Sequence, residues 1–156
     1  MYRKATSRRG FSLLEMLLVV VIIGLVAAIA IPRMSRGAAG AADAALTGNL
    51  AVLRDAIDRY ATEHAGTFPT AANIANQLTL YSSSAGATSA TKDTTYIYGP
   101  YVRKAPALPV GAKKGGSGIA AADGASVGWI YTETTGDIKA NTTTETDASG
   151  VLYSTY

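Results

Sequence analysis

The hydrophobic pattern of this chain opens with one long apolar run. From Phe11 to Ile31 the only ionisable side chain is that of Glu15. About 21 helical residues at roughly 1.5 Å each span roughly 30 Å, which is the thickness of the hydrocarbon core of a bilayer. The run therefore predicts a helix, residues 11–32, that can cross a membrane once.

The next segment, residues 33–65, has the pattern of an amphipathic helix. Its large apolar residues recur at intervals of 4, 3, 4 and 3, with charged residues on the other faces: Leu46, Leu50, Leu53, Ile57 and Tyr60. We expect this stripe to pack beneath a head and Gly66 to end the helix. Because Gly24 and Pro32 both weaken a helix, we also expect bending or local unwinding between them.

Residues 66–156 read as one small head. Ile74, Leu78 and Tyr81 have helical spacing and predict a short second helix capped by Thr70. The Ser, Thr, Ala and Gly rich residues 82–95 predict a surface loop.

A hairpin signal follows further along the head. Val127–Thr132 and Asp137–Ala140 flank Thr135–Gly136, which is typical of two strands joined by a tight turn. The polar segment Asn141–Tyr156 is expected to be only partly ordered. The predicted fold class is α+β: a long N-terminal helix with a small antiparallel sheet in the C-terminal head.

The lone carboxylate of the apolar run needs a counter-ion. An acidic residue at the centre of a spanning helix costs about 2.5–3.5 kcal/mol on insertion scales. If residues 1–10 are removed by a cut after Gly10, Phe11 gains a free amino terminus four residues before Glu15, on the same helical face. In a packed array of copies, Glu15 can instead neutralise the amino terminus of a neighbour, and it would then set the register between subunits.

These residues carry a family resemblance. The basic leader and the junction that follows it resemble the prepilin processing site of type IV pilins and of type II secretion pseudopilins: Lys4, Arg8, Arg9, Gly10 and then Phe11–Glu15. The resemblance implies that a membrane aspartyl peptidase cuts after Gly10 and N-methylates Phe11, and that Glu15 acts in assembly. Gly24 and Pro32 fall where the helix of that family has its glycine and its proline. The resemblance covers about the first 65 residues.

Two other interpretations of the N-terminus stay open. An ordinary secretory signal cut after Ala30 would release a soluble binding domain, although the apolar run exceeds the usual length of about 7–15 residues and Glu15 interrupts it. An unprocessed single-pass anchor would leave Glu15 without a partner.

The basic charge of the chain lies mostly in the leader. The whole sequence has 14 Lys plus Arg against 11 Asp plus Glu. Four of the cations, Arg3, Lys4, Arg8 and Arg9, precede the cut, and the remaining ten face the same 11 acids, a net charge of −1. We therefore expect no nucleic-acid partner, and the leader is expected on the cytoplasmic side, with the head outside.

Charge within the head is unevenly distributed. Residues 88–118 contain five cations and one acid, whereas residues 120–156 contain five acids and one lysine. Solvated loops explain this pattern, and so does attraction between the heads of neighbouring copies.

The chemistry available to the head is limited. The chain has no cysteine, which excludes a disulfide and a thiolate metal site. Major pseudopilins bind calcium in this part of the head, and four residues supply hard oxygens for such a site: Asp137, Asn141, Glu145 and Asp147. A solvated polar tail is the alternative interpretation.

A chance motif has to be considered beside these residues. Residues 124–128 fit the G-x-S-x-G elbow of hydrolases, but the only histidine, His64, lies upstream and is expected to be solvent-facing or helix-terminal. We therefore predict no enzymatic activity.

The sequence as a whole favours a structural subunit of a bacterial envelope filament. Gly99–Pro100–Tyr101 and Leu108–Pro109 resemble a stretch of major pseudopilins, although the Asp-Pro-Trp-Gly that follows it in that family is missing here. The resemblance implies a homopolymer, processed by prepilin peptidase, held in inner-membrane lipid before assembly and handled by an inner-membrane assembly platform. The expected product is a periplasmic pseudopilus of type II protein secretion. A type IV pilus subunit is the alternative.

Overall fold

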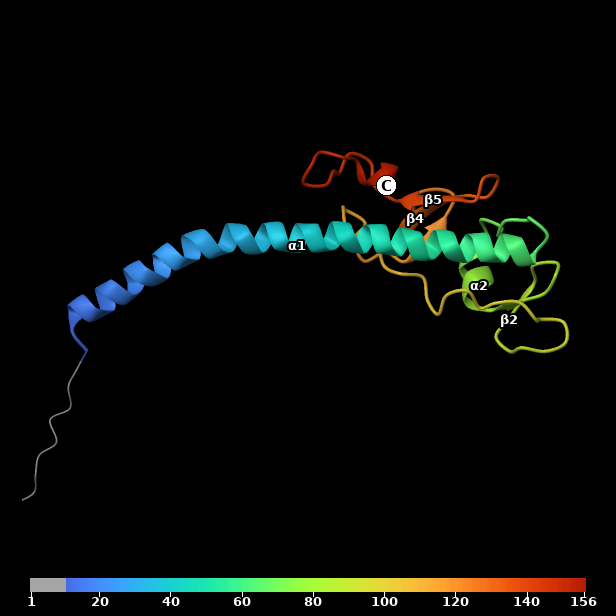
Figure 1. The fold of residues 1–156 in the computed structure, drawn as a ribbon, viewed down its shortest axis with the longest axis horizontal. Coiled ribbons are helices and arrows are strands. Elements are labelled where there is room, and N and C mark those ends of the chain that lie inside the picture. Colours follow the sequence, from blue (N-terminus) through green and yellow to red (C-terminus); the bar gives the residue numbers. More distant parts are fainter. Residues whose placement is uncertain (1–10) are drawn as a thin grey trace, which may run out of the picture. The chain divides into compact units, whose positions relative to one another are not determined.

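The computed structural model describes residues 11–156, apart from the side chains of residues 31–36. Its helices are α1 (Leu13–Glu63), α2 (Ile74–Thr79) and the 3-10 turn η1 (Tyr153–Thr155). Its strands are β1 (Tyr81–Ser82), β2 (Thr88–Ser89), β3 (Gly118–Ala120), β4 (Val127–Thr132) and β5 (Asp137–Ala140) (Figure 1). The chain divides into two compact units, one ending at Ala38 and the other, the head, covering Ala39–Tyr156. The α+β class predicted from the sequence is confirmed.

Helix α1 is continuous through Gly24 and Pro32, so the local unwinding expected there is not present in the single chain. Glycine and proline lower the stability of a helix by about 1 and about 3 kcal/mol relative to alanine, but neither has to break a long helix. The helix ends where the sequence predicted. Gly66 adopts a left-handed φ of +84° and its N–H donates to the carbonyl of Ala61 at 2.7 Å, which closes the last turn.

The predicted stripe of α1 forms the centre of the head core. Its five large residues, Leu46, Leu50, Leu53, Ile57 and Tyr60, are at most 2% exposed. They pack with residues of β4 and β5, including Trp129, Tyr131 and Ile138. The polar atoms of the two buried aromatic residues of β4 are satisfied, because Trp129 Nε1 donates to the Pro106 carbonyl at 2.8 Å and the Tyr131 hydroxyl to the Pro69 carbonyl at 2.9 Å.

The hairpin is confirmed at its predicted bounds. Strands β4 and β5 are antiparallel, with Trp129 opposite Ala140 and Tyr131 opposite Ile138. Gly136 in the turn has a φ of +75°, and a Cβ there would lie 2.5 Å from the ring of Phe68, so only glycine fits.

The sheet is not wholly antiparallel as predicted. Strand β3 pairs with β4 in the parallel direction, with a register shift between Gly118 and Ile119. A second sheet of two short antiparallel strands joins β1 to β2. These strands are two or three residues long, too short to carry a period-2 pattern in the sequence.

Three local predictions in residues 70–83 were wrong. Helix α2 follows Asn73 rather than Thr70, whose N–H donates to Gln77 Oε1 at 2.9 Å. Tyr81 belongs to β1 instead of α2. Ser82 and Ser83 are buried rather than on a surface loop. The Ser82 hydroxyl and the Ser83 carbonyl both lie within hydrogen-bond distance of Nε2 of His64.

The C-terminal segment is tied to the head rather than partly ordered. Arg54 of α1 donates through Nη2 to the main-chain oxygens of Ile138 and Tyr156. The Tyr153 hydroxyl donates to Asp43 Oδ1 of α1 at 2.8 Å. These contacts hold η1 against the helix.

The buried stripe gives a direct test of the fold. Leu53→Ala removes a fully buried side chain and should lower the free energy of unfolding of the full chain in detergent by about 2–5 kcal/mol. Its neighbour Val52 is 51% exposed, so Val52→Ala is the matched control and should change that free energy by less than about 0.5 kcal/mol. Denaturant titration of the single Trp129 reports both. Equal losses from the two variants would contradict the packing described.

Candidate functional site: the N-terminal assembly helix and the head

The first half of α1 presents apolar side chains to its surroundings. Between Phe11 and Ile29 the only polar side chains are those of Ser12 and Glu15. All the apolar side chains larger than alanine in this segment are exposed, from 44% at Val19 to 84% at Leu13. Leu13–Ala30 is long and apolar enough to cross a membrane, and no part of it is buried in the structure. Such a surface requires lipid or other protein to cover it.

Glu15 lies exposed in the first turn of α1. A carboxylate in this position interacts favourably with the helix dipole, which contributes about 0.3–1 kcal/mol. That gain is smaller than the cost of about 2.5–3.5 kcal/mol for an acid at the centre of a bilayer. Glu15 lies at one end of the apolar run, so this cost is an upper bound for it. The dipole alone would not offset burial of Glu15 at the bilayer centre, and we therefore expect a cationic partner where the first turn of α1 is buried in an apolar medium.

The other predicted residues of this segment are placed as follows. Phe11 precedes α1 and is 75% exposed, whereas Gly10 and the rest of the leader, residues 1–10, lie outside the described residues. Gly24 lies within α1, where an added Cβ would meet nothing within 4 Å. Pro32 also lies within α1, and its side chain is outside the described set.

Sequence reasoning missed the cap of this helix. Ser12 accepts a hydrogen bond from the Leu14 N–H through Oγ at 3.3 Å, and its carbonyl accepts from the Met16 N–H at 3.2 Å. A serine immediately before an apolar helix is the usual signal for such an N-cap. Ser12 therefore caps α1, which starts at the next residue, Leu13.

The structure does not gather the four candidate calcium ligands around one centre. Asp137 is exposed at the start of β5. The Asn141 amide instead donates to Asp123 Oδ1 at 2.8 Å and to the Val127 carbonyl at 2.7 Å. Within residues 11–156 no group of three or more His, Cys, Asp or Glu side chains is arranged to hold a metal.

The two remaining candidates, Glu145 and Asp147, bind backbone donors. Glu145 Oε1 accepts from the Ala112 N–H at 2.9 Å, and Oε2 accepts from the N–H groups of Thr143 and Thr144 at 2.9 and 3.1 Å. Asp147 accepts the N–H groups of Ser149 and Val151, both at 2.8 Å, and the Tyr156 hydroxyl at 2.6 Å. Calcium binding stays a prediction, and the carboxylates as arranged connect loops through hydrogen bonds.

Of the two positions expected for His64, the helix-terminal one is confirmed, because α1 ends at Glu63, and the solvent-facing one is wrong, because His64 is buried. Its ring stacks on Tyr60 with centroids 3.8 Å apart, Nδ1 lies 2.9 Å from the Tyr60 carbonyl, and Nε2 lies 3.0 Å from the Ser83 carbonyl. The burial follows from the stripe of α1, because His64 continues its spacing four residues after Tyr60. None of these contacts involves Ser126 of the hydrolase-like motif, which lies in a turn before β4.

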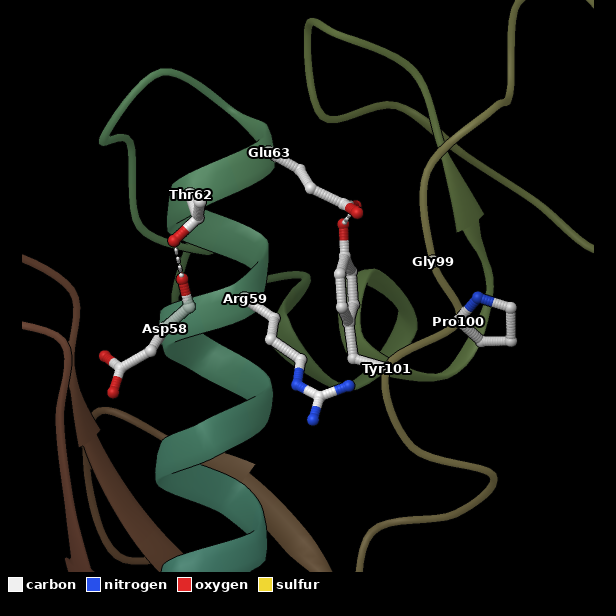
Figure 2. Close-up of a pocket in the computed structure, with 7 residues that line it drawn as sticks. All are labelled: Asp58, Arg59, Thr62, Glu63, Gly99, Pro100 and Tyr101. Atoms are coloured by element: carbon white, nitrogen blue, oxygen red, sulfur yellow. Dashed lines mark hydrogen bonds between the residues drawn. The ribbon is translucent and has the colours of Figure 1, made fainter.

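An open groove lies at the end of α1, beside the predicted Gly99–Pro100–Tyr101 stretch (Figure 2). Its volume is about 540 Å³, and it is lined by Asp58, Arg59, Thr62, Glu63, Gly99, Pro100 and Tyr101. The Tyr101 hydroxyl donates to Glu63 Oε2 at 2.6 Å. Burial of the hydroxyl and then the nearby Glu63 carboxylate raise the pKa of Tyr101, so the hydroxyl keeps the proton that it donates at physiological pH.

The carboxylate of Glu145 predicts how the head responds to acid. The N–H groups of Ala112 and Thr143 lower its pKa from 4.5 to about 2. A lowered pKa in the folded state stabilises the head above about pH 4.5, and this contribution is lost as the pH falls toward 2. Glu145→Gln should therefore lower the Tm at pH 7. It should also flatten the fall in Tm between roughly pH 5 and pH 2.5, the range in which Glu145 becomes protonated.

The control for this experiment is Asp58→Asn, since Asp58 is exposed and its carboxylate makes no hydrogen bond among the described residues. This variant should keep the Tm and the pH profile of the parent chain. An unchanged pH profile in Glu145→Gln would show that Glu145 does not hold the loops together.

Comparison with known proteins adds one match. Residues 6–31 match the family model of the prokaryotic N-terminal methylation motif, a range that includes Gly10, Phe11 and Glu15. No curated protein and no solved structure matches the chain. The matched range coincides with the leader junction and the exposed apolar half of α1. The N-terminal segment of the chain therefore carries the prokaryotic N-terminal methylation motif, which supports its similarity to type IV pilin-like proteins.

Proposed function

We propose that this protein is the building block of a bacterial envelope filament, processed by prepilin peptidase and polymerised through the first half of α1. The observation that carries the proposal is the exposed apolar helix with a single acid, Glu15, within the methylation motif. The motif and this helix fit a membrane-anchored, pilin-like filament subunit.

The chemistry of assembly follows from the exposed surface. Lipid covers the apolar side chains of Phe11–Ile29 before assembly, and the same surface of neighbouring subunits covers them in the filament. Removal of the leader after Gly10 would create a cation at Phe11, and Glu15 of an adjacent subunit would neutralise it. Breaking such a buried pair costs about 3–5 kcal/mol, so the pair selects one register among many that are equally apolar.

Within this class we propose a major pseudopilin of type II protein secretion. Three features support the choice: the lack of cysteine, the small head, and the Gly99–Pro100–Tyr101 stretch at the groove. The partners would be copies of the same chain, prepilin peptidase and an inner-membrane assembly platform. The filament would then lie in the periplasm, whereas the alternative, a type IV pilus subunit, would reach the cell surface.

The mature N-terminus tests the proposal. Mass spectrometry of the protein isolated from cell membranes should find a chain that begins at Phe11 with an N-methyl group. A chain that begins at Ile31 would indicate release by ordinary signal peptidase, and one that retains Met1 would indicate an unprocessed anchor. Either result would refute the filament proposal.

Glu15 gives a second prediction. The Glu15→Ala chain should still enter the membrane, because loss of the acid favours insertion. It should lower the polymer yield on the order of a hundred-fold or more, because it removes one member of a buried ion pair. Sheared and pelleted filaments measure the yield, and membrane fractionation measures insertion.

Ser12→Ala is the matched control for Glu15→Ala. It removes the neighbouring helix cap, at a cost of about 1 kcal/mol, but leaves the charge in place. It should therefore reduce the polymer much less than Glu15→Ala does. Normal polymer yield from Glu15→Ala would remove the argument that Glu15 sets the register.

A further inference from the structure

The groove at the end of α1 carries an acidic side chain without a cationic partner. Arg59 is paired with Asp55, with Nε 3.0 Å from Oδ2. Among the described side chains, no cation lies within 4.0 Å of the carboxylates of Glu63 or Asp58. Figure 2 shows Glu63 on the same side of the helix as Tyr101, whereas Asp58 points to the other side. Glu63 is thus the carboxylate that faces the groove.

The head also presents a basic loop, which we call the lysine loop, residues 109–116. Two hydrogen bonds close its neck, from Gly115 N–H to the Leu108 carbonyl and from Leu108 N–H to the Gly116 carbonyl, both at 2.8 Å. Lys113 at its tip is 2.9 Å from Asp123 of the same head. Lys114 is exposed, and no carboxylate lies within 4.0 Å of it among the described residues. The loop therefore holds one ammonium group ready for an external partner.

The groove and the lysine loop lie at different levels along the same helix. Tyr101 contacts Glu63 at the groove, and six residues later the Ala107 carbonyl accepts a hydrogen bond from Asn49 Nδ2 at 3.1 Å, just before the loop. Residues 101–107 therefore follow α1 backwards from Glu63 to Asn49. These two helix positions are 14 residues apart, or about 21 Å at roughly 1.5 Å per residue.

We propose that the lysine loop of one subunit docks in the groove of another copy of this chain, with Lys114 facing Glu63. The inference rests on the proposed function and adds a contact between heads to the helix contact at Glu15. The two surfaces are different and are displaced along the helix, so each head has both a donor and an acceptor surface. Such a heterologous contact is the kind that an open filament needs, because each added subunit leaves one donor and one acceptor surface free at the ends unless the rotation closes a ring. The charge pair at the rim would fix which subunits meet and would be screened by salt.

Cross-linking tests the contact, because the natural chain has no cysteine. In the full-length chain, Ala112→Cys places a thiol on the loop and Thr62→Cys places one at the groove, while both charges are kept. Both positions are exposed. A short bis-maleimide applied to filaments of the double variant should produce a ladder of covalent multimers. The matched control pairs Thr62→Cys with Ala87→Cys, an exposed alanine in a different loop, and should give only background.

Charge removal tests the named pair within the same background. Lys114→Gln and Glu63→Gln should each reduce the ladder of multimers several-fold. Both substitutions keep the local backbone, and the glutamine side chain at position 63 can still accept the hydrogen bond from the Tyr101 hydroxyl. The two changes together should reduce the ladder no further than either alone, because they remove one shared interaction. Additive losses would show that the two side chains do not meet.

The outcomes separate the inference from the proposed function. Filaments that form but cross-link through Ala112→Cys no better than through Ala87→Cys would overturn the head contact and leave the filament proposal intact. If the parent chain forms no filaments at all, the proposed function and the head contact are both refuted.

Discussion

The structure depends on the need to cover an apolar helix that carries one charge. The large apolar side chains from Phe11 to Ile29 are exposed, and the surface they present is too large to remain in water. Lipid covers it without discrimination, and so does a bundle of identical helices. In the proposed filament, Glu15 would be the one residue of this surface that distinguishes between neighbours, because only a subunit that places a cation beside it would remove the cost of its burial.

The head is built on the second half of the same helix. The stripe from Leu46 to Tyr60 contributes one side of its core, and the hairpin of β4 and β5 contributes the other. Without a disulfide, the loops are connected by charge-assisted hydrogen bonds: Glu145 joins the lysine loop to the C-terminal segment, and Arg54 holds that segment to α1. The loop that is proposed to contact another subunit is therefore fixed by the same carboxylate that makes the head sensitive to acid.

The parts predicted from the sequence are those with a strong local pattern. The stripe of α1 has the helical period over four turns, and the helix was predicted to within two residues at each end. The hairpin around Thr135–Gly136 was predicted with the bounds that its two strands have. The burial of His64 was missed although it continues the stripe, because a polar residue at a helix end is usually solvated. The strand β3 and the contact of Glu145 with Ala112 were missed for a different reason. They depend on segments far apart in the chain that approach only in the folded head.

A filament reconstruction by electron cryomicroscopy would measure the distance between Glu15 of one subunit and the amino terminus of its neighbour. We expect the Glu15 carboxylate of each subunit to lie within hydrogen-bond distance of the Phe11 amino group of a neighbour, about 2.7–3.2 Å between heavy atoms. A filament in which Glu15 faces solvent or lipid, with no amino terminus beside it, would contradict that claim.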